Sequence, residues 1–269
     1  MLVNKISFGS ILFLIGSVLG LVAFSWPLYI PQSELYLLQP EAARLLAVII
    51  VCVGVGVVAL EISRGTMDAK SVAVLGVLAA VIAALRMVGA GAVGVEPMWF
   101  LLILASYAFG SKFGFSLGIV SMATSAVLTG GIGAWLPFQM LAAGWIGWFA
   151  GIIGSLFSAK MGNRSNKLLL VFLGVFSSLA FGLLMDLQLW PWLTGADTQL
   201  SYLAGAGVSE NLQRFIMFHA ATALSWDIPR AITTAALISI TANPILNSLK
   251  RAKLRLNLIS PVTAQKATV

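Results

Sequence analysis

Long apolar runs separated by short polar connections dominate the pattern of this chain. A helix needs about 20 mostly apolar residues to cross the hydrocarbon core of a bilayer, so each run predicts a membrane-spanning helix. The fourth run is short for a full crossing, and the last is long enough to begin outside the hydrocarbon. The pattern predicts an all-α fold, a polytopic transmembrane helical bundle of about eight spans. The runs cover residues 7–27, 43–61, 71–88, 97–110, 113–130, 137–158, 168–189 and 216–245.

The first run has the position of a secretory signal peptide. Its apolar core is longer than the apolar region of such a peptide, and no small-residue cleavage site follows it. We therefore expect the run to be retained as a helix.

If the chain crosses the bilayer at each predicted span, its basic residues are distributed unevenly between the two sides of the membrane. Only Arg44 and Arg214 flank the spans on one side. Because Lys and Arg are retained on the cytoplasmic side of a membrane, both termini are expected in the cytoplasm. The basic tail, residues 250–269, then lies against anionic lipid headgroups. The residues assigned to the cytoplasmic side are Lys5, Arg64, Lys70, Lys112, Lys160, Arg164, Lys167, Lys250, Arg251, Lys253 and Arg255.

Composition supports a membrane protein and excludes other classes. Hydrophobic residues make up 59% of the chain and charged residues only 9%, against about 25% charged residues in soluble domains. The net charge of +7 raises the possibility of nucleic-acid binding, but the basic residues form no stripe with aromatic residues. The lone Cys52 lies inside an apolar run, which excludes a disulfide framework and a thiolate metal site. We expect the cell membrane of a bacterium, and no metal or cofactor in this chain.

Three connections are expected on the outer side: 88–96, 130–136 and about 190–215. The last is long and carries Trp190, Trp192 and Tyr202. Trp and Tyr routinely form an aromatic belt at the membrane surface, whereas long structureless connections are often functional. The connection is therefore either part of such a belt or a lid over a binding site.

Four ionisable residues lie within the predicted spans, namely Arg86, Asp186, Asp227 and Arg230. Each costs at least about 2.5 kcal/mol in hydrocarbon, and such residues usually mark function. Asp227 and Arg230 are three residues apart and share a helix face. Pro229 between them removes a backbone hydrogen bond and is expected to bend the helix.

Two interpretations of these charges remain open. They are either structural ion pairs that join helices or a polar pocket open to the outside. Aromatic walls with a few convergent polar groups are typical of small-molecule sites, and the outer connections bring such groups to the same level. His219, near the outer end of the last span, is more often a solvated or hydrogen-bonded residue than a ligand. The candidate substrate-binding residues are Arg86, Glu96, Trp99, Trp135, Gln139, Asp186, Trp226, Asp227 and Arg230.

Small residues recur at helical spacing on two spans. Small residues let helices approach closely in a membrane, where no hydrophobic force drives them together. We assign Gly144, Gly147, Gly151 and Gly154 to packing inside the bundle. The face on the third span either packs inside the bundle or docks another membrane protein. That face consists of Gly76, Ala79, Ala80, Ala83 and Ala84.

Several short motifs match known functional patterns but lack the structural context that those functions require. Residues 89–94 match G-x-G-x-x-G but follow a membrane helix, not a strand. Ser116 lies in a G-x-S-x-G motif at the cytoplasmic end of its span, whereas His219 lies at the outer end of another, so the two cannot form a dyad. No P-loop is present, and the chain lacks the matching halves of a secondary transporter. Any uphill transport must draw its energy from partner proteins.

The order and spacing of three segments resemble the substrate-binding S component of energy-coupling factor (ECF) transporters, in particular S components of the actinobacterial type. The resemblance extends from about Ser71 to Leu249, or about two-thirds of the chain. Each motif alone is weak, but together their order is fairly specific. The segments are the Ala-rich stretch 76–86; 96–118 with its continuation through 130–139 and 144–147; and 222–231.

The resemblance implies a six-helix core, residues 70–249, preceded by two additional helices in residues 1–62 and followed by the tail 250–269. It implies an outward-facing site for a vitamin or cofactor precursor, with cobalamin as the first candidate. It also implies no enzymatic activity in this chain and three partners: a transmembrane T component and two ATPases that hydrolyse ATP. In the family, A-x-x-x-A residues contact the T component, and here they correspond to Ala79 with Ala83 and Ala80 with Ala84. A membrane enzyme and a structural or assembly protein remain the alternatives.

Overall fold

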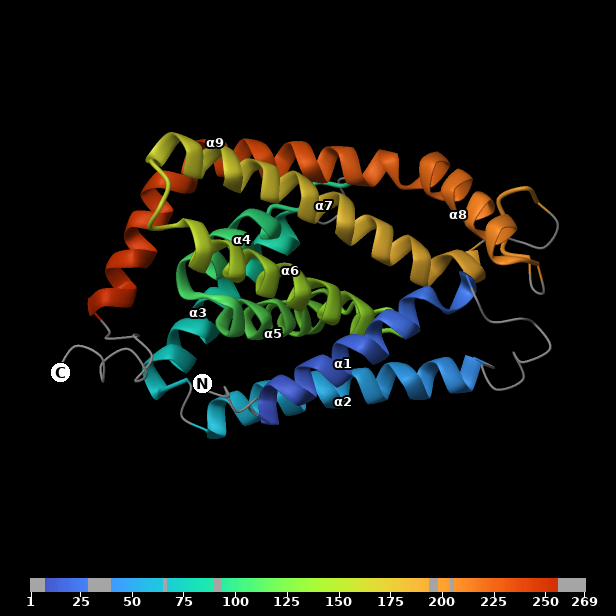
Figure 1. Cartoon of the computed structure of the whole chain (residues 1–269), viewed down its shortest axis with the longest axis horizontal. Coiled ribbons are helices and arrows are strands. Elements are labelled where there is room, and N and C mark those ends of the chain that lie inside the picture. Colours follow the sequence, from blue (N-terminus) through green and yellow to red (C-terminus); the bar gives the residue numbers. More distant parts are fainter. Residues whose placement is uncertain are drawn as a thin grey trace, which may run out of the picture.

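The structure is a computed structural model that describes residues 8–28, 40–64, 67–89, 93–193, 198–203 and 206–255. Lys5, the tail beyond Arg255 and the side chains of Arg44 and Trp192 lie outside the described residues. Within these ranges the fold is all-α, as predicted, and contains no strand (Figure 1). The helices are α1 (Phe8–Ser25), a 3-10 turn (Trp26–Leu28), α2 (Pro40–Ser63), α3 (Ala69–Val88), α4 (Met98–Phe109), α5 (Ser111–Thr129), α6 (Leu136–Phe157), α7 (Asn163–Leu193), α8 (Val208–Thr222) and α9 (Leu224–Arg255).

Six of the described helices are long and apolar enough to cross a membrane: α1, α3, α5, α6, α7 and α9. The chain is accordingly a multi-pass membrane protein. The predicted spans 43–61 and 97–110 contain only shorter apolar helical stretches, Val48–Leu60 within α2 and Met98–Phe109 in α4. About eight crossings therefore stays a prediction, with six long helices supporting it.

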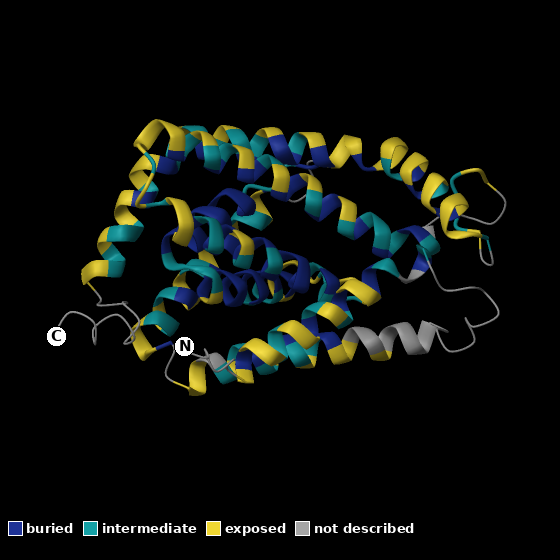
Figure 2. Ribbon diagram, in the orientation of Figure 1, coloured by how far each residue is buried: buried dark blue, intermediate teal, exposed yellow. Residues whose placement is uncertain are grey.

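The α4 helix differs most from its predicted role as a span. Its 12 residues rise only about 18 Å, against the roughly 30 Å of a bilayer core. Every residue from Met98 to Ala108 is buried, so α4 is a central helix enclosed by its neighbours (Figure 2). The connection before it is partly buried too, because Gly94, with φ +66°, lies directly against the backbone carbonyl of Trp226 in α9. The outer position of 88–96 stays a prediction, and its described part is packed against α9 as well as partly exposed.

Two further expectations change near the carboxyl end of the chain. The predicted last span, 216–245, is interrupted at Ala223, which separates α8 from α9. Helices enter the connection expected at about 190–215 from both sides, because α7 continues to Leu193 and α8 begins at Val208. Pro191 and Pro229 lie within α7 and α9 without ending them.

The closest helix packing in the core joins α5 and α6. Gly118 lies against the carbonyl group of Ala143, and Gly114 and Gly147 face each other backbone to backbone. A Cβ atom at any of these glycines would collide with main-chain atoms that cannot rotate away. The predicted glycine face of α6 is thus confirmed as a packing face, including Gly144 against Phe115, Gly151 against Gly110 and Gly154 against Tyr107.

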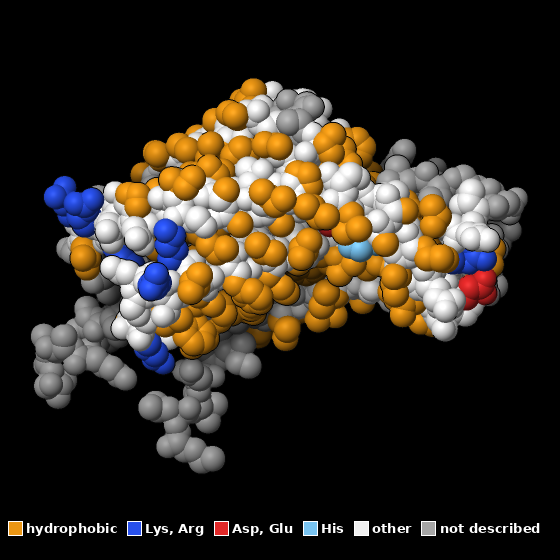
Figure 3. All heavy atoms as spheres, turned by 90° about the horizontal axis from the view of Figure 1, so that it is seen from above, with side chains coloured by type: hydrophobic (Ala, Val, Ile, Leu, Met, Phe, Trp, Pro, Cys, Tyr) orange, Lys and Arg blue, Asp and Glu red, His pale blue; other side chains and the backbone are white. Residues whose placement is uncertain are grey.

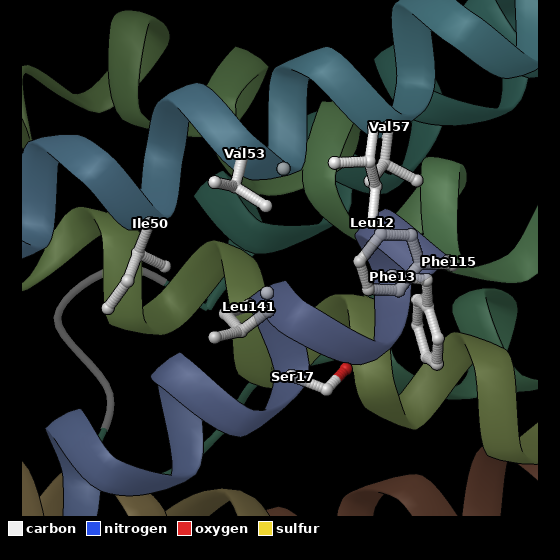
Figure 4. Close-up of a pocket in the computed structure, with 10 residues that line it drawn as sticks. Leu12, Phe13, Ser17, Ile50, Val53, Val57, Phe115 and Leu141 are labelled. Carbon is white, nitrogen blue, oxygen red and sulfur yellow. The ribbon is translucent and has the colours of Figure 1, made fainter. Parts of the chain in front are cut away.

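The α1 and α2 helices pack together against α5 and α6. Gly16 faces Val53 across the two helices, and the indole of Trp145 donates a hydrogen bond of 3.0 Å to Ser17 Oγ. A cavity of only about 10 Å³ remains between the four helices, lined by Phe13, Val53 and other apolar side chains (Figure 4). Such a volume barely accommodates one water molecule, so the N-terminal pair is closely fitted to the core.

The end of the α9 helix is tied to the end of α4. Lys253 Nζ donates a hydrogen bond of 2.9 Å to the carbonyl oxygen of Ala108 in the last turn of α4. A cation at this position also complements the partial negative charge at the carboxyl end of a helix. The last turns of α9 are therefore attached to the core rather than free.

Basic side chains gather at one end of the long axis. The α2–α3, α4–α5 and α6–α7 connections and the end of α9 all lie at this end, where α1 also begins (Figure 1). Most of the Lys and Arg side chains that this face shows lie at that end, and a smaller group lies beside acidic side chains at the other end (Figure 3). This distribution agrees with the predicted cytoplasmic position of both termini.

We predict that Gly118→Ala lowers stability in detergent by about 1–3 kcal/mol, the usual cost of overpacking a core. The added methyl group would force α5 away from the main chain of α6. Gly56→Ala is the matched control, because nothing lies within 4 Å of the position of its Cβ. Thermal unfolding followed by size-exclusion chromatography measures both, and equal melting midpoints would contradict the packing described here.

The orientation is tested by cysteine labelling in a Cys52→Ser background, since Cys52 is exposed. Ile132→Cys, at a residue that is 66% exposed, is expected to react with a membrane-impermeant maleimide on intact cells. Ala159→Cys, in the exposed α6–α7 connection, is expected to react only after the membrane is permeabilised. The reverse pattern would invert the topology.

Candidate functional site

One face of α7 carries small and polar residues at four-residue spacing and packs against α9 and α8. Gly182 is the most confined of these, because a Cβ atom there would collide with the carboxylate of Asp227. Ser178 Oγ lies 3.4 Å from Thr234 Oγ1. The spacing lets polar groups of α9 approach the α7 backbone inside the membrane, where no water solvates them. The residues of this α7 face are Gly174, Ser178, Gly182 and Asp186.

Arg230 is the most highly coordinated charge of the bundle. Its Nε donates to Glu96 Oε2 at 2.9 Å, and its Nη1 donates to Asp227 Oδ1 at 2.6 Å. Nη1 also lies 3.3 Å from the carbonyl oxygen of Ser178, and the guanidinium stacks over the ring of Phe181 at 5.2 Å. The residues Asp227 and Arg230 are only 2% and 5% exposed. A buried arginine is thus neutralised by two carboxylates from different segments.

Glu96 connects this ion network to the central helix. Its Oε2 accepts a hydrogen bond of 2.6 Å from the indole Nε1 of Trp99 as well as the one from Arg230. Trp99 is fully buried and packs against Phe181, with ring centroids 4.4 Å apart. The structure therefore brings together four of the predicted site residues: Glu96, Trp99, Asp227 and Arg230.

Arg86 forms a second polar group close to the first. Its Nη1 donates to Ser125 Oγ at 2.8 Å and its Nη2 to Gln139 Oε1 at 3.3 Å, which joins α3 to α5 and α6. Glu96 is the carboxylate whose electrostatic field acts on Arg86. Ser125 is a site residue that sequence reasoning missed, because a serine among apolar residues gives no distinctive signal.

Asp186 and His219 form a third polar group between α7 and α8. The Nδ1 atom of His219 lies 2.9 Å from Asp186 Oδ2, and its ring stacks on Phe215. Both side chains are partly exposed, at 24% for His219 and 18% for Asp186. His219 is hydrogen-bonded as expected, and its partner is Asp186 rather than Ser116.

Two predicted aromatic residues do not join the network. The residues Trp135 and Trp226 are 43% and 50% exposed. The ring of Trp135 lies over Gly133 in its own connection, and Trp226 contributes its main-chain carbonyl rather than its indole. Trp190, by contrast, is fully buried and donates a hydrogen bond of 2.7 Å to the carbonyl oxygen of Leu200.

One oxygen of the network has no hydrogen-bond donor among the described residues. It is Asp227 Oδ2, which is buried beside Gly182. An unpaired buried acceptor costs free energy and keeps its capacity to accept a hydrogen bond. The described residues contain no group of three His, Cys, Asp or Glu side chains that could hold a metal ion.

The small-residue face of α3 divides into two. Ala79 and Ala83 are 1% and 0% exposed and pack inside the bundle. Gly76, Ala80 and Ala84 are exposed, and nothing lies within 4 Å of a Cβ position at Gly76. The expectation that all five residues form one docking surface is therefore wrong, since neighbouring residues on a helix point about 100° apart. We refer to Gly76, Ala80 and Ala84 as the small-residue stripe.

No family model, curated protein or solved structure matches this chain.

We predict that Asp227→Asn and Arg230→Gln each destabilise the protein, by about 3–5 kcal/mol when one partner of a buried pair is removed. The double variant is expected to lose less than the sum of the two, because neither charge is then left unpaired. Unfolding in detergent measures the double-mutant cycle.

Arg214→Gln serves as the control for this cycle. Its pair with Glu210 is partly exposed, at 22% for Arg214 and 50% for Glu210, so its removal should change stability by no more than about 1 kcal/mol. Strict additivity of Asp227→Asn and Arg230→Gln would show that the buried pair is not energetically coupled.

Proposed function

We propose that this protein is the substrate-binding S component of an ECF-type importer. It captures a vitamin or cofactor precursor on the outer side of the membrane and delivers it together with a T component and two ATPases. The single observation that supports this function best is the convergence of polar groups in the interior of one bundle. They come from the helices α3, α5, α6, α7 and α9 and from the connection that precedes α4. Interior charges of this kind usually line solute sites.

Three charged residues of the interior, Arg230, Asp227 and Arg86, differ in how completely their hydrogen-bonding groups are satisfied. Arg230 is neutralised within the protein, whereas Asp227 Oδ2 lacks a donor and Arg86 has only neutral partners. A site that holds a solute needs groups with remaining hydrogen-bonding capacity, set against a rigid framework. Arg230 and Glu96 provide the framework in this proposal, and Arg86 and Asp227 provide the binding groups.

The small-residue stripe supports a partner in the membrane. It continues into an apolar groove of about 330 Å³ between α3 and α9, lined by Ala73, Val77 and other apolar residues. Small residues allow a second helix to approach closely, and the groove provides depth for its larger side chains. The proposed occupant is a helix of the T component, because a chain without a P-loop needs partners for uphill transport.

A structural role is the competing interpretation, and the closed contacts of Arg230 favour it. An ion network that only fastens α4, α7 and α9 would need no solute. The two interpretations differ in what copurifies. A structural protein retains no small molecule and has no ATPase partners.

The proposed function predicts a bound small molecule and three protein partners after gentle purification. Mass spectrometry of the denatured eluate identifies the molecule, and cobalamin is the first compound to seek. Deletion of the protein should abolish uptake of the same compound. Recovery of the chain alone, with no retained molecule and no uptake defect, would refute the proposal.

We further predict that Ala80→Trp or Ala84→Trp prevents copurification of the partners while the small molecule is retained. The indole would project from the small-residue stripe and keep the partner helix away. Ala236→Trp on α9 is the matched control, because Ala236 is also exposed but lies outside the stripe. Loss of partner and small molecule together would mean that the stripe belongs to the bundle interior.

A further inference from the structure

The two arginines of the bundle interior have different surroundings. Arg230 contacts two carboxylates, those of Glu96 and Asp227. Among the described residues, no carboxylate lies within ion-pair distance of Arg86, whose hydrogen-bond partners are the neutral oxygens of Ser125 and Gln139. Arginine remains charged under all ordinary conditions, so Arg86 carries a positive charge without a directly bound counter-ion.

Glu96 does not take that role in the observed arrangement, where its ion pair is with Arg230. It is the carboxylate whose field acts on Arg86, but its Oε2 already accepts hydrogen bonds from Arg230 and Trp99. Moving Glu96 toward Arg86 would leave Arg230 with one carboxylate and Trp99 without its acceptor. The existing network therefore holds Glu96 away from Arg86.

Further hydrogen-bond donors lie beside Arg86. A guanidinium has five N–H groups, and only Nη1 and Nη2 of Arg86 donate to protein acceptors. Because Oε1 of Gln139 accepts from Nη2, the amide NH₂ of Gln139 is directed elsewhere and remains a donor. Ser125 Oγ itself donates to the carbonyl oxygen of Met122, so it adds no capacity.

The amino end of α6 adds positive potential at the same place. Gln139 is the fourth residue of this 22-residue helix, and Trp135 at the N-cap makes no side-chain capping hydrogen bond. Helix amino ends carry about half a positive charge and favour anions. The helix contributes mainly its dipole, because Pro137 has no N–H and the main-chain amides of Leu136 and Gln139 already donate to Gly133 and Trp135. A cation, an amide donor and a helix amino end thus lie next to one another, with no carboxylate hydrogen-bonded to the cation, which is the chemistry of an oxyanion site.

We propose that Arg86, Gln139 and the amino end of α6 bind an oxyanion, a carboxylate or phosphate group carried by the transported solute. The identification of the oxyanion's carrier rests on the proposed function. An anionic lipid headgroup presents the same chemistry, and the experiment below separates the two sources. Arg86 is partly exposed, so its guanidinium is not sealed inside the bundle.

The test uses the full chain in a neutral detergent, with acetate and inorganic phosphate as probes against chloride at equal ionic strength. Both oxyanions should raise the melting midpoint of the wild type with increasing concentration, because a ligand that binds the native state stabilises it. Arg86→Gln should weaken the apparent affinity about tenfold or more, since hydrogen bonds to charged groups are the strong ones. Arg86→Lys should restore part of it, and Arg214→Gln should leave it unchanged.

A second measurement covers the case in which Arg86→Gln does not fold. Wild-type protein is treated with an arginine-selective dicarbonyl reagent, and modification of Arg86 is followed by peptide mass spectrometry. Phosphate should slow modification of Arg86 and leave the rate at Arg214 unchanged. An absence of oxyanion-dependent stabilisation, or of protection at Arg86, would overturn the proposal.

The source of the oxyanion is resolved by adding phosphatidylglycerol or phosphatidylcholine to the same detergent. Protection of Arg86 by phosphatidylglycerol alone, with none from acetate or phosphate, would assign the site to a lipid headgroup and overturn the solute proposal. Failure of the oxyanion proposal can be distinguished from failure of the proposed importer function. Copurified partners with no oxyanion effect would refute only the oxyanion site, whereas Arg86-dependent oxyanion binding without partners or uptake would refute only the importer.

Discussion

The neutralisation of Arg230 inside a bundle from which water is excluded is the constraint on which the arrangement of the interior depends. A guanidinium at this depth is tolerable only if acceptors surround it. Those acceptors come from three segments: Asp227 one turn away in α9, Ser178 on α7, and Glu96 in the connection before α4. Each of these elements is thereby held at a fixed position relative to α9. Glu96 then fixes Trp99, and Trp99 fixes the amino end of the buried central helix.

Glycine makes this arrangement sterically possible. At Gly182 the α7 backbone leaves space for the carboxylate of Asp227, and at Gly94 the chain passes directly over the carbonyl group of Trp226. Irregular backbone at membrane depth is tolerated only where protein or a polar cavity covers it. The contact between Gly94 and α9 provides that cover, so the same helix supplies the charges and shields the connection that reaches them.

The sequence allowed the all-α fold, a bundle of long apolar helices and the convergence of interior charges to be predicted, because apolar run lengths and the cost of buried charge are strong constraints. It predicted about eight spans, of which six are long apolar helices in the structure. It did not reveal that α4 is enclosed, since a short apolar run is compatible with a span and with a central helix alike. Trp226 does not join the buried network, because it is adjacent to Asp227 and so points to another side of the helix. The alanine face was misjudged for the same reason. The α7 face could have been found from the spacing of Gly174, Ser178, Gly182 and Asp186, whereas nothing in the local sequence marks the interruption at Ala223.

The attachment of Lys253 to Ala108 gives α4 a mechanical role. This short helix is held by α9 at both ends, through Glu96 and Arg230 at one and through Lys253 at the other. Because both of its ends are attached, this helix moves as a rigid body, so a displacement at one end is transmitted to the other. A displacement of Glu96 would therefore pass along α4 toward Ala108 and Lys253 at the basic end of the molecule.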